Sequence, residues 1–415
     1  MKAGIVCVGS ELLTGSVADT NGSHIARRLM KAGIDPAFQV TVGDDLDCIA
    51  TAVDEACRRA DVVIVSGGLG PTHDDLTRRA LAKAAGRELQ FSAELEAGIR
   101  RFFESKGKQM SPLNRVQAFL PLGSRAIANP LGTAPGIEME HEGARVYALP
   151  GVPGEMEVML SESVLPLIAQ APAGGAATVA TLWVAGVGEA DLAQRIGDVV
   201  EACRASGGPE VSILASGGRV AVGLRASASG QDAADRIGPV ESKIRRLLGD
   251  DVFGAGDQTL EAVVIEMAAA RGLTLSVAES FTGGSLASLL VSVPGSSAVF
   301  HTGFVTYAPE AKIKQLGVPA DLLERHGAVS KETASAMALG ARTASGASIG
   351  LSTTGEAGPD PQEKPVGTVF IGVSWDGGSQ VRRLTVSGSR GEIRSAGATA
   401  ALDTLRRWMQ DRDRA

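Results

Sequence analysis

The sequence has few of the residues that stabilise small disulfide-rich or zinc-binding domains. Its 415 residues include 4 cysteines, which are Cys7, Cys48, Cys57 and Cys203. They are scattered along the chain and form no Cys-x-x-Cys pair. We therefore expect neither a disulfide framework nor a zinc site built on cysteine. Cys7 lies within an apolar run and is interpreted as a core residue.

The sequence also lacks long apolar runs and an excess of positive charge. No apolar stretch is long enough to cross a bilayer, and the amino terminus, Met1–Val6, has no signal-peptide anatomy. We therefore expect a cytoplasmic protein that does not bind membranes. The 40 Lys and Arg residues are outnumbered by 47 Asp and Glu residues, so the formal net charge is −7. This charge argues against a general affinity for nucleic acid, and pairs such as Arg58-Arg59 have no interleaved aromatic residues.

The length and composition indicate a globular α/β protein with more than one core. A chain of 415 residues with 44% hydrophobic residues and 52 glycines predicts two or three domains with many tight turns. In the first part, the apolar runs Lys2–Val8, Pro36–Val42 and Asp61–Ser66 alternate with the helical patterns Gly22–Lys31 and Leu46–Arg59. This alternation predicts a parallel sheet with right-handed crossovers, in which ligands bind beyond the carboxyl ends of the strands.

Two polar loops, Gly9–Gly15 and Gly67–Asp75, follow strands of this predicted sheet. The glycines of the second loop allow its backbone to approach a phosphate, and the following helix offers its amino terminus. The adjacent carboxylates of Asp74 and Asp75 suit a hard divalent metal ion that contacts phosphate oxygens. In the alternative interpretation, these acids only interact with the dipole of the helix that they begin.

The pattern in the middle of the chain predicts a small α+β unit between two linkers. The small residues of Ala171–Ala177 predict the first linker and Gly254–Asp257 the second. Between them we expect three strands and two helices. The unit has no Gly-x-x-Gly loop with basic flanks, so we assign it no nucleic-acid binding and interpret it as a spacer.

The most informative stretch lies in the last third of the chain. An apolar, strand-like run, Leu273–Ala278, leads into the polar turn Glu279–Gly284 and then into the helical pattern Ser285–Val291. This order places Ser280 at a helix amino terminus, where free N–H groups would stabilise an anion or an oxyanion.

Lys312 is the candidate partner of Ser280. It follows a second predicted strand, Val299–Tyr307, and could fold back over the Ser280 turn. A serine becomes nucleophilic when a base removes its proton, and a lysine can act as that base when burial lowers its pKa. In the alternative interpretation, Ser280 or Thr282 only caps a helix and Lys312 is solvated. His301 is the other base in the neighbourhood.

Several motifs of this last third resemble the carboxy-terminal domain of the CinA family, a nicotinamide-mononucleotide deamidase. They are Ala278-Glu279-Ser280-x-Thr282-Gly283-Gly284, Pro294-Gly295-Ser296-Ser297, Gly327-Ala328-Val329-Ser330 and Thr354-Gly355-x-Ala357-Gly358-Pro359. The resemblance implies that Ser280, Tyr307 and Lys312 are catalytic and that no metal is needed. It also implies substrate contacts at Thr282, Gly283, Gly284, Thr354, Gly355, Arg390 and Arg394. Phe281 stands where the family usually has cysteine, and Glu356 where it usually has an apolar residue.

The first part of the chain resembles the amino-terminal CinA domain. The shared motifs include Asp19-Thr20-Asn21, Gly67-Gly68-Leu69-Gly70-Pro71-Thr72-x-Asp74-Asp75 and Leu149-Pro150-Gly151-Val152-Pro153-x-Glu155. That fold is shared with molybdopterin-binding proteins, and in CinA proteins it is similar to a metal-dependent ADP-ribose pyrophosphatase. The resemblance implies a site formed by Glu11, Asp19, Asn21, Asp44, Gly68, Gly70 and Glu155, with a divalent metal ion on Asp74 and Asp75.

These observations predict an α/β protein of three domains. Residues 1–170 would form a parallel-sheet, molybdopterin-binding-like domain, residues 178–254 a KH-like α+β domain, and residues 258–410 an α/β deamidase domain. The resemblance implies a homodimeric enzyme of pyridine-nucleotide salvage that acts on nicotinamide mononucleotide and ADP-ribose. The alternative is a non-catalytic regulatory protein that binds a pterin or a nucleotide and is linked to competence or DNA damage.

Overall fold

The computed structural model describes residues 1–169, 178–226 and 231–414, which fold into two compact units. The first unit comprises Met1–Val179 with Ala226–Asp235, and the second comprises Ala180–Arg225 with Arg236–Ala415. The first predicted linker lies outside the described residues. Among the described residues, no helix combines the length and apolarity that a membrane span requires.

The first unit is built on a six-stranded sheet in the order β2-β1-β3-β8-β7-β6. The four strands β2 (Asp35–Val42), β1 (Lys2–Val8), β3 (Val62–Ser66) and β8 (Ala144–Leu149) are parallel, and the sequence predicts the first three of them. The predicted parallel sheet contains one reversed strand, because β7 (Gly136–His141) is antiparallel to both of its neighbours, β8 and β6 (Arg125–Ile127). A two-residue turn at Glu142 and Gly143, with φ of 50° and 80°, joins β7 to β8 and reverses the chain.

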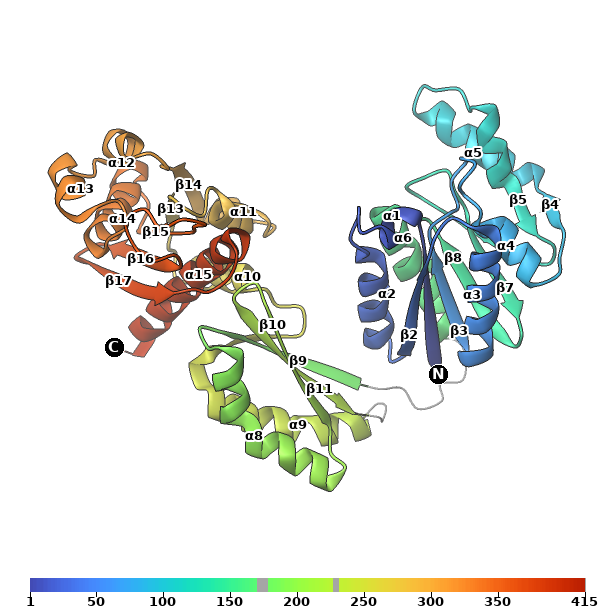
Figure 1. The fold of residues 1–415 in the computed structure, drawn as a ribbon, viewed down its shortest axis with the longest axis horizontal. Coiled ribbons are helices and arrows are strands. Elements are labelled where there is room, and N and C mark those ends of the chain that lie inside the picture. Colours follow the sequence, from blue (N-terminus) through green and yellow to red (C-terminus); the bar gives the residue numbers. More distant parts are fainter. Residues whose placement is uncertain (170–177, 227–230, 415) are drawn as a thin grey trace. The chain divides into compact units, whose positions relative to one another are not determined.

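Helices cover both faces of this sheet (Figure 1). One face packs against α2 (Thr20–Lys31) and α6 (Pro153–Met159), and the other against α3 (Leu46–Arg59) and α4 (Thr77–Ala84). Because both faces are covered, every residue of β3 is buried, which explains its continuous apolar run. The remaining elements of this unit are α1 (Ser10–Leu13), β4 (Leu89–Phe91), α5 (Ala93–Ser105), η1 (Pro112–Ala118), β5 (Phe119–Pro121), η2 (Leu160–Val164) and α7 (Leu165–Ala169).

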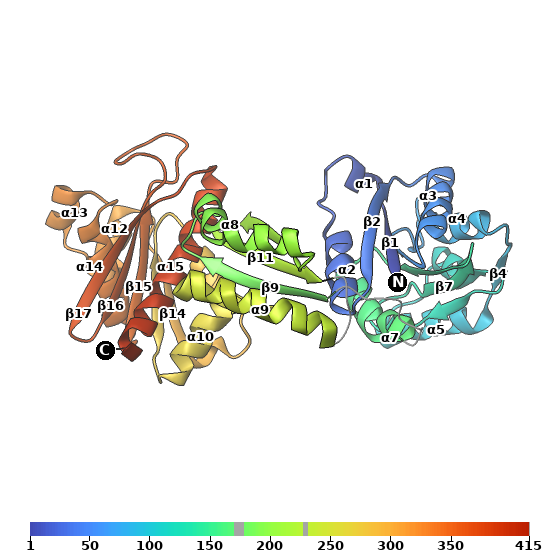
Figure 2. The same cartoon turned by 90° about the horizontal axis from the view of Figure 1, so that it is seen from below.

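The second unit begins with a four-stranded sheet in the order β10-β11-β9-β12. Its strands are β9 (Thr178–Ala185), β10 (Glu210–Ser216), β11 (Arg219–Ala226) and β12 (Val252–Ala255). The helices α8 (Glu189–Ser206) and α9 (Gln231–Leu248) cover one face of this sheet (Figure 2), and the short η3 (Gly249–Asp251) follows. The second predicted linker is wrong for Gly254 and Ala255, because their backbone extends the sheet by pairing with β9.

The rest of the second unit contains a five-stranded sheet in the order β14-β13-β15-β16-β17. The strands β14 (Phe300–Val305), β13 (Leu275–Glu279) and β15 (Ile349–Gly355) are parallel. The strands β16 (Thr368–Trp375) and β17 (Gly378–Thr385) are antiparallel. The central parallel strand β13 ends one residue before Ser280, so the candidate nucleophile lies at the carboxyl edge of the sheet.

Helices also cover both faces of this second sheet. The helices α10 (Leu260–Ala270), α11 (Ser285–Val291) and α15 (Arg390–Arg414) pack on one face. The helices α12 (Pro309–Leu316) and α14 (Lys331–Ser345) pack on the other. The remaining elements are the short η4 (Ser296–Ala298) and α13 (Ala320–His326).

A buried ionic cluster connects α15 to η3. The carboxylate of Asp403 accepts hydrogen bonds from Arg406 at 2.6 Å and from Arg407 at 2.8 Å. The same guanidinium groups donate to the carbonyl oxygen of Asp250 at 2.7 Å and to the carboxylate of Asp251 at 2.8 Å. A buried arginine requires such compensation, so this cluster fixes α15 against η3.

Candidate active sites

Ser280 is held in a tight turn directly after β13. Its amide donates to the carbonyl oxygen of Thr353 at 3.0 Å, and its own carbonyl oxygen accepts from the amide of Gly283 at 3.2 Å. The residue is only 8% exposed. The turn is therefore fixed from both sides before any ligand is bound.

Lys312 is fully buried beside Ser280. It lies in the first turn of α12, and its Nζ donates to Ser280 Oγ at 3.1 Å. The same nitrogen donates to the carbonyl oxygens of Thr306 at 2.8 Å and Tyr307 at 3.0 Å. The interpretation of Lys312 as a solvated side chain is therefore wrong.

Burial lowers the pKa of Lys312 to about 8, although the carboxylates of Glu363 and Glu310 raise it. Burial has this effect because it disfavours the charged form of an amine. A neutral amine has two hydrogens and one lone pair. If the two hydrogens bond to the carbonyls of Thr306 and Tyr307, the lone pair points to the hydroxyl of Ser280. The arrangement therefore suits a general base.

Tyr307 contributes its backbone, and not its side chain, to this pair. The side chain is 62% exposed, and its hydroxyl accepts a hydrogen bond from Nη2 of Arg390 at 3.2 Å. Nη1 of Arg390 donates to the carbonyl oxygen of Gly358. Tyr307 and Arg390 thus lie at the rim of the site, where they can contact a substrate as it enters. His301 is exposed on the edge strand β14.

The first amides of α11 are not open to an external anion, so the predicted anion or oxyanion could bind only at the preceding turn. The amide of Gly284 donates to the carboxylate of Glu279 at 2.9 Å, and the amide of Gly283 is already bonded to Ser280. Within the described part of the chain, the amides of Phe281 and Thr282 have no hydrogen-bond acceptor. They are the donors of this turn that remain available.

The other predicted substrate residues mainly support the turn. Arg394 donates to the carbonyl oxygens of Phe281 at 3.1 Å and Thr282 at 3.0 Å. The hydroxyls of Thr282 and Thr353 lie 2.8 Å apart, and Thr354 donates to the carbonyl oxygen of Ala328 at 2.7 Å. Thr282 and Thr354 are both fully buried, so these hydroxyls hold neighbouring segments in place.

Phe281 and Glu356 both have structural contacts. The buried ring of Phe281 fits against Gly397 and Gly355, where an added Cβ would lie 2.4 Å and 3.2 Å from it. The carboxylate of Glu356 accepts hydrogen bonds from the amides of Gln362 and Glu363, each at 3.2 Å. The aromatic ring therefore fills the core beneath Ser280, and Glu356 stabilises the loop before β16.

A second candidate site lies at the carboxyl edge of the sheet in the first unit. It is a cavity of about 400 Å³ that includes the glycine-rich loop Gly67–Pro71. Its lining contains no lysine, arginine or histidine among the described residues. It contains five acidic residues, all of which the sequence analysis singled out: Glu11, Asp44, Asp74, Asp75 and Glu155. A cavity with this charge pattern attracts cations.

The two predicted metal ligands, Asp74 and Asp75, are both bonded to Thr72. The hydroxyl of Thr72 donates to both carboxylates, and this hydrogen bond lowers the pKa of Asp74. Asp75 also accepts from the amides of Gly70 at 2.7 Å and Thr72 at 2.8 Å. Gly70 and Gly68 have no room for a side chain, because an added Cβ would lie 2.4 Å from Asp75 and 2.3 Å from Thr77.

Asp19 and Asn21 line a smaller neighbouring cavity of about 130 Å³, which Glu11 also lines. Asp19 caps α2 by accepting from the amide of Gly22 at 2.8 Å. Asn21 donates to Ser66 Oγ at 3.0 Å and to the carbonyl oxygen of Gly151 at 2.8 Å. The structure therefore groups all nine residues predicted for this domain around two adjacent cavities.

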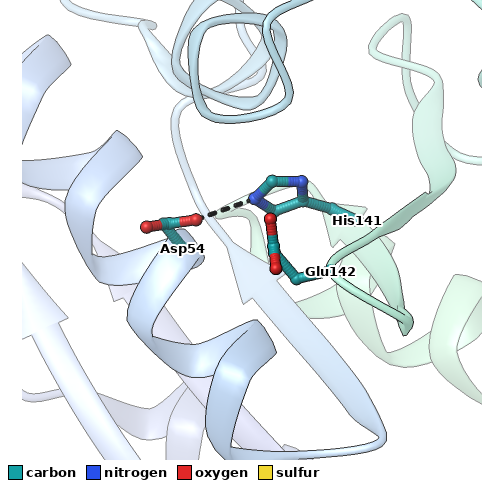
Figure 3. Close-up of side chains that lie close together, drawn as sticks. All are labelled: Asp54, His141 and Glu142. Atoms are coloured by element: carbon teal, nitrogen blue, oxygen red, sulfur yellow. Dashed lines mark hydrogen bonds and ion pairs between the residues drawn. The ribbon is translucent and has the colours of Figure 1, made fainter.

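A group that the sequence analysis missed lies at the opposite edge of this sheet (Figure 3). Asp54 on α3 and the pair His141 and Glu142 at the β7–β8 turn have potential ligand atoms within 4.8 Å of one another. Asp54 already accepts hydrogen bonds from Arg58 and from the His141 ring, the latter at 3.0 Å. We interpret the group as an ion-pair cluster that fixes the turn to α3. Residues so far apart in sequence give no motif that could have predicted it.

The geometry thus defines an α/β protein with a buried serine–lysine pair in one unit and an acidic cavity in the other. Three family models match the chain: "Probable molybdopterin binding domain" at residues 4–170, "Damage-inducible protein CinA KH domain" at 180–254, and "CinA C-terminal domain" at 257–409. The predicted three-domain arrangement is therefore confirmed.

Full-length relatives give the same result. The chain is 45% identical over 418 residues to a CinA-like protein of Frankia casuarinae, covering 99% of this chain and 96% of that protein. It is 42% identical over 411 residues to a CinA-like protein of Geobacter sulfurreducens, covering 98% and 99%. A solved structure of CinA from Thermoplasma acidophilum is 36% identical, with a TM-score of 0.37, and covers 40% of this chain and 99% of that one. The chain belongs to the CinA family.

Proposed function

We propose that the carboxy-terminal site hydrolyses the carboxamide of nicotinamide mononucleotide to nicotinate mononucleotide and ammonia. The observation that carries this proposal is the hydrogen bond of 3.1 Å between Lys312 Nζ and Ser280 Oγ, formed by a fully buried lysine. The pKa of Lys312, lowered to about 8, leaves part of the lysine neutral near pH 7. The family resemblance of the surrounding motifs supplies the identity of the substrate.

The reaction would proceed through an acyl-enzyme. Ser280 Oγ attacks the carboxamide carbon while Lys312 takes the hydroxyl proton. Lys312 returns this proton to the departing nitrogen, the C–N bond breaks, and ammonia leaves. Water then attacks the ester carbon while Lys312 takes one of its protons, and Lys312 returns this proton to Ser280 Oγ as the bond to Ser280 breaks. The nicotinic acid mononucleotide product leaves and ionises to the carboxylate in water. The free amides of Phe281 and Thr282 are the backbone donors suited to the oxyanion.

Replacement of the nucleophile tests this proposal. We expect Ser280→Ala to reduce ammonia release by about 10³-fold or more, because the oxygen that forms the covalent bond is lost. Ser288→Ala is the matched control, since the side chain of this exposed serine on α11 forms no hydrogen bond with Ser280 or Lys312 in the described structure. Binding of nicotinamide mononucleotide, measured by calorimetry, should survive in both variants. Retention of more than about a tenth of the wild-type rate in Ser280→Ala would refute the nucleophile.

We further propose that the amino-terminal cavity is a metal-dependent ADP-ribose pyrophosphatase site. Its lining has five carboxylates and, among the described residues, no basic side chain. A pyrophosphate would be repelled by this lining unless a cation came with it. Carboxylate oxygens are the ligands that hard divalent ions prefer, so the donor set fits such an ion. Asp74 and Asp75 would hold it, and the bound ion would neutralise charge on the phosphate oxygens.

Chelation and substitution test this second activity. EDTA should abolish hydrolysis of ADP-ribose, and added Mg²⁺ should restore it. Asp74→Asn should lower the rate at least about tenfold. Asp54→Asn, which removes an acid of the ion-pair cluster at the other edge, should leave the rate unchanged. Saturable binding of ADP-ribose without turnover would instead indicate the non-catalytic module.

A further inference from the structure

The residue immediately before the nucleophile is a carboxylate with no exposed surface. Glu279 ends β13 and is 0% exposed. Its Oε2 accepts from the amides of Gly284 at 2.9 Å and Leu286 at 3.0 Å, and its Oε1 accepts from the amide of Ala287 at 2.8 Å. No basic side chain of the described chain forms a salt bridge with it. Three backbone amides at the start of α11 therefore replace a basic side chain in compensating the buried charge.

Through these contacts the carboxylate of Glu279 occupies the amino terminus of α11. The first amides of a helix are unpaired within the helix and attract negative charge. Here the protein's own carboxylate takes that position, so the oxygens of a substrate cannot use the same amides. Of the amides between Ser280 and Ala287, those of Phe281 and Thr282 are left without an acceptor in the described structure.

Glu279 is also bonded to the segment that holds Lys312. Its carbonyl oxygen accepts from the amide of Thr306 at 2.8 Å. The carbonyl oxygen of Thr306 in turn accepts from Lys312 Nζ at 2.8 Å. One residue thus fixes the serine turn through its side chain and the lysine segment through its backbone.

We propose that Glu279 is the positioning residue of the serine–lysine pair. Its carboxylate fixes the Ser280–Gly284 turn, so that Ser280 Oγ stays within reach of Lys312 and the amides of Phe281 and Thr282 stay free for the oxyanion. This inference rests on the proposed deamidation. It assigns to Glu279 no contact with the substrate. It also differs from ordinary helix capping, because the capped turn carries the nucleophile.

The test compares Glu279→Gln with the control Thr259→Ala. Glutamine has one acceptor oxygen, and its NH₂ group faces backbone donors, so at least one of the three bonds is lost. Thr259 caps α10 by accepting from the amide of Ala262 at 3.3 Å, and its loss removes a helix cap of the same unit away from Ser280. Turnover is measured per folded molecule, with the folded fraction taken from thermal unfolding.

For Glu279→Gln we expect kcat to fall at least about tenfold, KM to change by less than about threefold, and the apparent pKa in the pH–rate profile to stay unchanged. For Thr259→Ala we expect a lower Tm with unchanged kcat. Hydrogen exchange of the Gly284, Leu286 and Ala287 amides should accelerate in Glu279→Gln and not in Thr259→Ala. If Glu279→Gln does not fold, Glu279→Asp, whose shorter carboxylate keeps the charge, is measured in the same way.

The outcomes separate this inference from the proposed function. If the wild type releases no ammonia from nicotinamide mononucleotide, the proposed deamidation is wrong, and exchange at the three amides still tests the positioning contacts. If the wild type is active while the variants of Glu279 retain wild-type kcat, Glu279 only caps a helix and the positioning role is refuted. Unchanged exchange at the three amides in the variants would also refute it.

Discussion

The two candidate sites both lie at the carboxyl edge of a sheet, but they differ in how their charged groups are compensated. In the second unit, Lys312 is fully buried beside Ser280. The amides that follow the Ser280 turn bond to the carboxylate of Glu279. In the first unit, five acidic residues line the cavity, and the described lining has no basic side chain to compensate their negative charge. A closed site can thus shift a pKa by burial, whereas an open acidic site requires an added cation before it can bind a phosphate.

The largest effect should come from changing the buried base. Lys312→Arg should lower deamidation by about 10³-fold or more, because a guanidinium stays protonated and cannot accept the proton of Ser280. Lys314→Arg, at an exposed position two residues further along α12, should have no effect. Ammonia release by both variants is the measurement. An active Lys312→Arg enzyme would mean that position 312 supplies only positive charge, and the comparison of the two sites would fail.

The next largest effect should be a loss of thermal stability in the second unit and not in the first. Asp403→Asn should cost the second unit about 3–5 kcal/mol, because it leaves the buried Arg406 and its neighbour Arg407 without their carboxylate. Calorimetry should show one transition moved to lower temperature. Hydrolysis of ADP-ribose, the activity that we propose for the first unit, should persist after this transition. Loss of both activities at the same temperature would contradict the expectation that the two compact units unfold separately.

The smallest expected effect comes from changing the pKa of Lys312. The carboxylate of Glu363 raises the pKa of Lys312, so Glu363→Gln should lower it. A lower pKa increases the neutral fraction of lysine below pH 8, and deamidation at pH 6.5 should therefore rise by about two- to threefold. Glu310→Gln, the other carboxylate that raises this pKa, should give a smaller change in the same direction. A fall in the rate at pH 6.5, with unchanged stability, would contradict the base role.

The sequence allowed the local elements around both sites to be predicted, because periodicity and turn residues are local signals. The strand Lys2–Val8 and the helix Leu46–Arg59 have the predicted bounds. The approach of Lys312 to Ser280 was predicted from the strand between them and from the family resemblance. The sequence does not indicate that Lys312 belongs to a helix, or that its hydrogen-bond partners include two backbone carbonyl oxygens.

Three features escaped the sequence analysis because they depend on distant contacts. The role of Glu279 depends on how α11 turns back over β13, and the sequence shows only an acid before a serine. The effect of Glu363 on Lys312 depends on a loop that comes 51 residues later in the chain. The reversed direction of β7 depends on its pairing with β8 across the turn at Glu142 and Gly143, for which the sequence analysis makes no prediction.

The role of Lys312 as a metal-independent base is best tested by the pH–rate profile of deamidation in the presence of EDTA. We expect kcat/KM for nicotinamide mononucleotide to rise with pH to a plateau, with an apparent pKa of about 8, that of Lys312, and with full activity without metal. Loss of activity on chelation, or a rate independent of pH between about 6 and 9, would contradict a buried lysine as the base.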